Sequence, residues 1–203
     1  MPTLLEPETG RLRLRQWQLA DREPFARLNA DPRVMACFPA LLERAASDAL
    51  AERCAALIGE RGWGFWAVDL KERGKFIGFV GLHVPSAELP FAPCVEIGWR
   101  LAHEYWGQGL ASEAARAALR VGFTTLALPE IVAFTARSNL RSQAVMAGIG
   151  MRDAGTPFAH PAVPVGHPLR EHVLYRLTRE RWASQEKETV DVGGDLPCPG
   201  AGA

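Results

Sequence analysis

The sequence predicts one domain of mixed α/β class, built from strands that alternate with helices. Its 203 residues, 48% of them hydrophobic, are enough for one substantial core and few for two complete domains. Segments with the two-residue period of strands are interleaved with segments that have the spacing of amphipathic helices. Beyond Ala183 the composition turns polar and then rich in glycine and proline, which predicts a flexible tail.

The N-terminal third is expected to form one strand and two helices. Residues 11–17 alternate basic and apolar side chains, as a strand with one buried face does. Asp21 is suited to cap a helix that ends before Pro32. Residues 43–61 are rich in alanine and leucine and favour a second helix, closed by Gly62.

Three strands are expected in the middle of the chain. Residues 63–70 and 75–84 are rich in aromatic and β-branched residues, and the short link between them predicts an antiparallel pair, with Trp63 and Trp66 packed in the sheet. Residues 94–101 are the third strand, and successive side chains of a strand point to opposite faces. One face therefore carries Val95, Ile97, Trp99 and Leu101, and the other carries Glu96, Gly98 and Arg100.

The C-terminal half continues the alternation. Apolar spacing predicts helices at residues 111–126 and 140–147, and β-branched and aromatic residues predict strands at residues 130–136 and 172–177. Residues 157–168 contain four prolines, so we expect a loop without regular structure there.

Charge and cysteine usage exclude several classes of function. Twenty-three basic residues balance twenty-three acidic ones, so no strong field favours nucleic acid or an anionic membrane as a partner. The four cysteines lie far apart and lack the spacing of a zinc or redox site. The N-terminus has no apolar signal region and no apolar run approaches the length of a membrane span, so we expect a cytoplasmic protein.

Three histidines, His160, His167 and His172, lie in and beside the proline-rich loop. They have neither nearby cysteines nor paired carboxylates, so we expect solvated loop histidines and no metal site. A contact of His167 or His172 with the acceptor substrate stays open.

The loop at residues 105–111 carries the clearest functional signal. It reads Tyr-Trp-Gly-Gln-Gly-Leu-Ala and joins a strand to an amphipathic helix. Glycines let several backbone N–H groups converge, and a helix start adds the positive end of its dipole, which together suit a pyrophosphate. The simpler alternative is that Gly107 and Gly109 only permit a tight turn.

Spacing excludes two other phosphate-binding motifs. A P-loop needs Lys and then Ser or Thr after its last glycine, where Leu110 and Ala111 stand. A dinucleotide fold places its glycines after the first strand and an acidic residue about twenty positions on. Here the loop follows several strands, and Glu130 is a poor candidate for that acidic residue.

Residues 96–101 and 105–114 together resemble the acetyl-CoA signature of the GNAT superfamily of N-acetyltransferases. The branch that they resemble is that of ribosomal-protein N-terminal acetyltransferases. Residues 11–15 with Asp21 are similar to the opening strand and helix cap of that branch. Its second motif is matched by Asn139, Ser142 and Gly150-Met151. The resemblance covers residues 11–182, which leaves residues 1–10 as an extension and residues 183–203 as the tail.

The resemblance implies a central mixed, mostly antiparallel, splayed sheet flanked by helices, with acetyl-CoA as co-substrate. The cofactor would lie where the strand at residues 94–101 diverges from that at residues 130–136. Splaying frees backbone groups that can pair with the amides of pantetheine. The residues so implied are Ile97, Trp99 and Leu101 for pantetheine, Trp106, Gly107, Gln108, Gly109, Leu110, Ala111 and Ser112 around the pyrophosphate, and Asn139 with Ser142.

Two positions depart from the wider superfamily. Trp106 stands where a Gln or Arg usually opens the pyrophosphate loop, so binding would rest on backbone amides. Met146 stands where many members carry a Tyr that protonates the leaving thiolate.

Two side chains are candidates for catalysis of acetyl transfer to an amine. Most free amines are protonated at neutral pH, so a general base helps the attack on the thioester, and Glu96 is the leading candidate. The alternative is a strand carboxylate paired with a neighbouring Arg. Ser142 could hydrogen-bond the thiolate in place of the missing Tyr, or merely satisfy N–H groups at a helix start.

The acceptor is expected to be a primary amine, either a protein N-terminal α-amine or a small molecule. The sequence leaves open a different acyl group and a homodimer. The alternative function is a catalytically weak CoA-binding sensor or interaction module, which the replacement by Met146 suggests.

Overall fold

Every strand and helix expected from the sequence is present in the computed structural model, which describes residues 2–85 and 88–192. The strands are β1 (Leu12–Arg15), β2 (Phe65–Leu70), β3 (Lys75–His83), β4 (Glu96–Leu101), β5 (Glu130–Ala136), β6 (Arg152–Asp153), β7 (Phe158–Ala159) and β8 (Glu171–Thr178). The helices are α1 (Arg22–Asn29), α2 (Arg44–Arg61), α3 (Leu110–Arg120), α4 (Leu140–Gly148) and α5 (Arg179–Val192). A π-helical turn, Val121–Thr125, extends α3.

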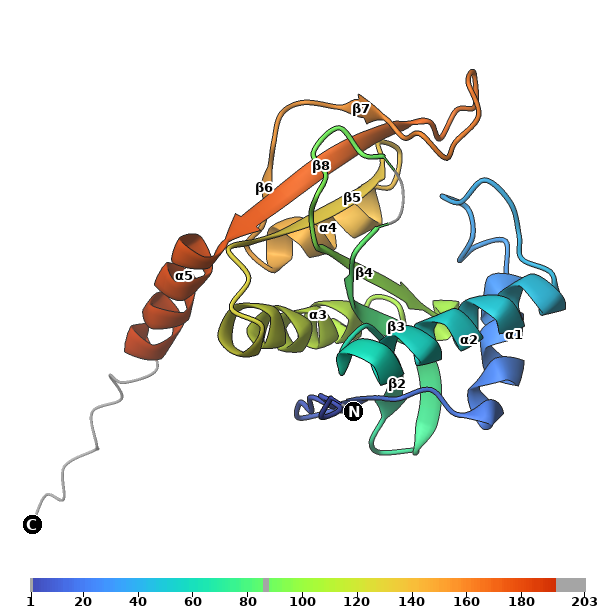
Figure 1. The fold of residues 1–203 in the computed structure, drawn as a ribbon, viewed down its shortest axis with the longest axis horizontal. Helices are drawn as coiled ribbons and strands as arrows, with labels where there is room; N and C mark the ends of the chain where they lie inside the picture. The colour runs from blue at the N-terminus through green and yellow to red at the C-terminus, as the bar shows by residue number, and fades with distance from the viewer. Residues whose placement is uncertain (1, 86–87, 193–203) are drawn as a thin grey trace, which may run out of the picture.

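One sheet organises the molecule (Figure 1). Its strands follow the order β1-β2-β3-β4-β5-β8-β6, and β7 pairs with β8. All neighbours are antiparallel except β4 and β5, which are parallel. This confirms the mixed, mostly antiparallel sheet expected from the sequence.

Helices cover the two faces of the sheet differently. On one face, Arg100 of β4 bonds Asn29 of α1, and Phe79 of β3 packs against Phe25 of the same helix. On the other face, Trp99 bonds Ser142 of α4, and the turn after α3 packs on Ile131 and Leu82. The alternation of side chains predicted for β4 is therefore confirmed, because its two faces pack against different helices.

Two segments are more ordered than their composition indicates. Residues 183–192 of the expected tail are helical, since α5 continues to Val192, and residues 193–203 lie outside the described part of the chain. Trp182 stacks on Phe123 with ring centroids 5.3 Å apart, which docks α5 against the turn after α3. The proline-rich loop also contains β7, which pairs with β8 in the register Phe158↔His172. Packing and strand pairing stabilise both segments, and local composition does not report either.

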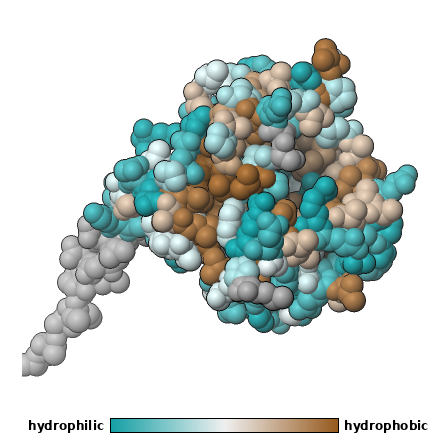
Figure 2. Space-filling view, viewed as in Figure 1, coloured by the Kyte–Doolittle hydropathy of each residue, from teal (hydrophilic) through white to brown (hydrophobic). Residues whose placement is uncertain are grey.

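On the surface seen in the direction of Figure 1, one group of hydrophobic residues lies near the middle of the face, others lie at its right-hand edges, and hydrophilic residues cover most of the rest (Figure 2). None of the helices in the described ranges is long and apolar enough to cross a membrane.

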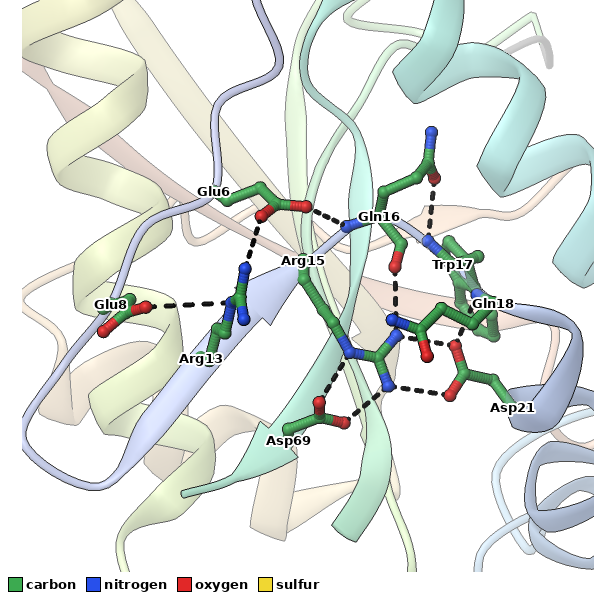
Figure 3. A network of polar contacts seen from close by, with 9 residues as sticks. All are labelled: Glu6, Glu8, Arg13, Arg15, Gln16, Trp17, Gln18, Asp21 and Asp69. Carbon is green, nitrogen blue, oxygen red and sulfur yellow. Dashed lines mark hydrogen bonds and ion pairs between the residues drawn. The ribbon is translucent and has the colours of Figure 1, made fainter. Parts of the chain in front are cut away.

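A buried ion-pair network ties β1 to its surroundings (Figure 3). Arg15 donates to both carboxylate oxygens of Asp69 at 2.5 and 2.7 Å and to both of Asp21 at 2.7 and 2.8 Å. Asp21 stands at the N-cap position of α1 but makes no side-chain cap, because its oxygens accept from Arg15 and from the backbone of Gln18. Asp21 therefore stands at the predicted N-cap position of α1, but the side-chain cap expected there is not formed.

Replacing Arg15 should destabilise the fold strongly. Arg15→Met leaves the carboxylate of Asp21, which is 2% exposed, without its cation, so we expect a loss of about 3–5 kcal/mol in the free energy of unfolding. The matched control is Arg13→Met on the same strand, where the half-exposed side chain pairs with Glu6 and Glu8 and should contribute within about 1 kcal/mol. Urea titrations of both variants measure this, and equal losses would contradict it.

Candidate active site

The sheet opens between β4 and β5. The two strands pair at a single position, Glu96↔Val132, where the Val132 N–H donates to the carbonyl of Val95 at 2.9 Å. On its other side, β4 pairs with β3 along its whole length. The backbone of residues 97–101 therefore has no strand partner on the β5 side in the described structure, which is the splayed geometry expected.

The glycine loop ends at the start of α3. Gly107 and Gly109 have φ angles of 74° and 73°, a left-handed conformation that side chains with a Cβ rarely adopt. Gly109 stands at the N-cap of α3, and no side chain caps the first turn. The Gln108 side chain turns back to bond the carbonyl of Glu104 at 2.9 Å. The loop therefore offers backbone N–H groups and the positive end of the helix dipole, which is an anion-binding geometry.

The segment just before β1 holds this loop in place. The Arg11 side chain donates to the Gln108 carbonyl at 3.0 Å and to the carboxylate of Glu113 at 2.6 Å. Thr9 donates to the same carboxylate. The sequence pattern does not predict these contacts, since the partners lie about a hundred residues apart, and the only local signal is an acidic residue in the first turn of a helix.

Trp106 closes the end of β4. Its indole Nε1 donates to the Leu101 carbonyl at 2.8 Å, and the guanidinium of Arg141 lies 4.9 Å from its ring centroid. One of the backbone carbonyls expected to contact pantetheine is therefore already bonded within the protein. The Trp106 side chain contacts the end of β4 and Arg141. It therefore does not supply the charged or amide contact to phosphate that a Gln or Arg would make at this position.

Asn139 and Ser142 lie together at the start of α4. Asn139 caps the helix, since its Oδ1 accepts from the Ser142 N–H at 3.2 Å and its Nδ2 donates to Thr135 Oγ1 at 2.9 Å. Ser142 Oγ accepts from Trp99 Nε1 at 3.0 Å, which links α4 to β4 across the opening of the sheet. The serine hydroxyl is thus an acceptor toward Trp99 and keeps its own proton to donate. Met146 is 2% exposed and packs in the core.

Glu96 sits at the one point where β4 and β5 meet. Burial raises the pKa of its carboxyl to about 7. It has no hydrogen-bond or ion-pair partner in the described part of the chain, so the alternative of a pair with a neighbouring arginine does not hold. Its cross-strand neighbour on β3 is His83, whose pKa burial lowers. The site therefore contains a carboxyl that can take up or release a proton near neutral pH.

We expect solvated loop histidines from the sequence, but all three histidines are partly buried. The rings of His160 and His172 lie 4.7 Å apart and pack with Phe134 and Phe158. Burial lowers the pKa of both imidazoles. His167 is half-buried, and its Nδ1 accepts from the backbone of Leu169. Among the side chains that the structure describes, in residues 2–85 and 88–188, no group of three or more His, Cys, Asp or Glu is arranged to hold a metal ion.

The opened sheet and the glycine loop at the start of α3 form the architecture that the GNAT resemblance implies, and comparison with known proteins identifies the family. Residues 11–152 match the acetyltransferase (GNAT) domain. The chain therefore belongs to the GNAT acetyltransferase family, as its motifs predict.

Relatives and solved structures agree with this assignment. The FsC-acetyl coenzyme A-N(2)-transacetylase of Aspergillus fumigatus is 36% identical over 133 residues, which are 64% of this chain and 56% of that protein. This chain thus spans little more than half of that relative's length. A GNAT-family acetyltransferase from Bacillus anthracis superposes with a TM-score of 0.72 at 26% identity, covering 87% of this chain and 99% of that one.

A ribosomal-protein-S5-alanine acetyltransferase from Vibrio fischeri also superposes, with a TM-score of 0.68 over 88% of this chain and 98% of that one. Its identity of 20% shows a shared fold.

Proposed function

We propose that this chain is an acetyl-CoA-dependent N-acetyltransferase that moves the acetyl group to a primary amine by direct attack on the thioester. The observation that carries the proposal is Glu96, an unpaired carboxyl with a pKa of about 7 at the edge of the opening between β4 and β5. A general base works best when its pKa lies near the working pH.

Two sets of backbone groups would hold the co-substrate. The unpaired edge of β4 at Ile97 and Trp99 matches the amides of pantetheine, as an added strand would. The N–H groups of residues 107–112 suit the pyrophosphate, and their number offsets the lack of a charged side chain at Trp106. Arg11 supports this loop by donating hydrogen bonds to the Gln108 carbonyl and to the Glu113 carboxylate in the first turn of α3.

The chemistry then follows from the side chains at the opening. Glu96 accepts a proton from the ammonium form of the acceptor, and the neutral nitrogen attacks the thioester carbon. A C–N bond forms, the C–S bond breaks, and the electron pair leaves on sulfur. The new amide nitrogen then loses its second proton, which passes to the thiolate and gives the neutral amide and the CoA thiol. Ser142 donates a hydrogen bond from its hydroxyl to the thiolate. Met146 cannot stabilise the thiolate in this way, because its side chain has no proton to donate and is buried in the core.

The acceptor is a protein N-terminal α-amine or a small-molecule amine. The name of the Aspergillus fumigatus relative specifies acetyl coenzyme A as donor and a nitrogen as acceptor, which supports both halves of the proposal.

Acetyl-CoA should stabilise the protein against heat more than NAD or ATP does. A ligand at a hundredfold excess over its dissociation constant adds about 2.7 kcal/mol to the free energy of unfolding, which gives a clear melting shift. Mass spectrometry of candidate peptides and amines with acetyl-CoA, read together with thiol release, then tests transfer. Equal shifts with NAD would count against the site. Binding without any transfer would favour the CoA-binding sensor instead.

A further inference from the structure

Arg100 is a partly buried cation whose charge no carboxylate meets in the described part of the chain. Its Nη1 donates to Asn29 Oδ1 at 2.6 Å, and its guanidinium lies 4.0 Å from the ring centroid of Phe38 and 5.4 Å from that of Phe79. Burial lowers its pKa to about 10, so it remains charged at neutral pH. A charge that is largely removed from water without an opposite charge costs stability, so such a residue is a candidate for binding an anionic group.

The surroundings of Arg100 hold it in one orientation. Asn29 and Ser47 are both fully buried, and Asn29 Nδ2 donates to Ser47 Oγ at 2.9 Å. This bond turns the amide oxygen of Asn29 toward Arg100. Phe38 belongs to the long connection between α1 and α2, which covers the guanidinium. Long connections of this kind often contribute to binding sites.

Arg15 is a useful comparison for Arg100, because its guanidinium is fully paired with carboxylates. Its Nε and Nη2 together grip the carboxylate of Asp69. In Arg100 this edge is unused, because Nε is buried without a partner and Nη2 donates to no acceptor in the described chain. The planar Nε–Nη2 edge matches a carboxylate with two parallel hydrogen bonds.

Arg100 and Glu96 share one face of β4. They are four residues apart, so their Cα atoms are separated by about 13 Å along the strand. The ring of Phe65 lies between them, since a Cβ added at Gly98 would come within 3.1 Å of it. This face thus presents a proton acceptor, an aromatic surface and a fixed cation in a line.

From this arrangement we propose that Arg100 binds a carboxylate of the acceptor, whose amine lies at Glu96. The acceptor would then be an amino carboxylate whose two charged groups are several bonds apart, with an apolar portion over Phe65. An α-amino acid carries both groups on one carbon and is too short to reach both residues. This inference rests on the proposed function, since it assumes that Glu96 marks the position of the attacking amine.

The test compares ω-amino carboxylates of increasing length with n-alkylamines of the same length as acceptors. We expect the wild type to favour the best amino carboxylate over its matched alkylamine by about 10- to 100-fold in kcat/KM, mainly through KM. Arg100→Met should bring this ratio close to one, and Arg100→Lys should lower it, because the ammonium keeps the charge but lacks the planar edge. Arg33→Met, on the same connection but exposed and paired with Asp31, should keep the wild-type ratio.

The outcomes separate the two proposals. Turnover of amines without a carboxylate preference, or a wild-type ratio in Arg100→Met, would overturn this inference and leave N-acetyl transfer standing. No thiol release with any amine would overturn both. If Arg100→Met does not melt cooperatively, the test uses the ratio of kcat/KM values in Arg100→Lys. A wild-type ratio in that variant would also overturn this inference.

Discussion

Gly109→Val is expected to abolish binding of acetyl-CoA. Gly109 has a φ of 73°, which a β-branched residue adopts only with strain, and it stands at the N-cap of α3, where the N–H groups converge. In the free protein, an added Cβ meets only Arg11 Nη2 at 3.7 Å, an ordinary contact. The loss should therefore come from the altered backbone and from the side chain standing where phosphate must approach.

Gly74→Val is the matched control for that variant. Gly74 has a φ of 54° in the turn between β2 and β3, and an added Cβ there meets nothing within 4 Å. Both variants introduce the same side chain at a left-handed position, so both should lose a similar amount of stability. Calorimetric titration with acetyl-CoA should detect binding to Gly74→Val alone. Wild-type affinity in Gly109→Val would show that the cofactor lies elsewhere.

Glu96→Gln is expected to lower turnover by about 10²–10⁴-fold while affinity for acetyl-CoA hardly changes. Glutamine keeps the shape of the side chain and removes the proton acceptor, so only the chemical step should suffer. With the natural carboxyl, kcat/KM should rise with pH to a plateau above the pKa of about 7. The variant should lack this inflection and gain rate steadily as pH frees the amine.

The same carboxyl should leave a mark on stability. Burial raises its folded-state pKa from 4.5 to about 7, so between these values the folded state binds more protons than the unfolded state. Stability therefore falls as pH rises through this window, by on the order of 3 kcal/mol, and stays low above it. Glu96→Gln avoids this loss, so its advantage over wild type should grow from near zero at about pH 4 to its maximum at about pH 8.

Two results would contradict the role of Glu96. Wild-type turnover in Glu96→Gln would make the residue a structural carboxylate, with the proton passing to water or to another group. A pH-independent difference in stability between the two proteins would show that the carboxyl is not held in the environment described. Urea titrations at several pH values supply the second measurement without an acceptor.

Much of the fold was predictable because local patterns encode it. The alternation in residues 94–101 assigns Trp99 to one face and Glu96 with Arg100 to the other, as the structure confirms. Gly62 ends α2 in a left-handed conformation, as predicted. Backbone preferences and side-chain period act within a few residues, so one sequence suffices to detect them.

The contacts that build the candidate site were decided only by the tertiary structure. Arg11 and Glu113 are 102 residues apart, and Asp21 is bound by Arg15 where local chemistry favours a helix cap. Whether Arg100 has a carboxylate beside it depends on what α1 and the connection after it bring to β4. Such pairings depend on the packing of distant segments, because each polar group selects its partner only after the backbone has brought the candidates together.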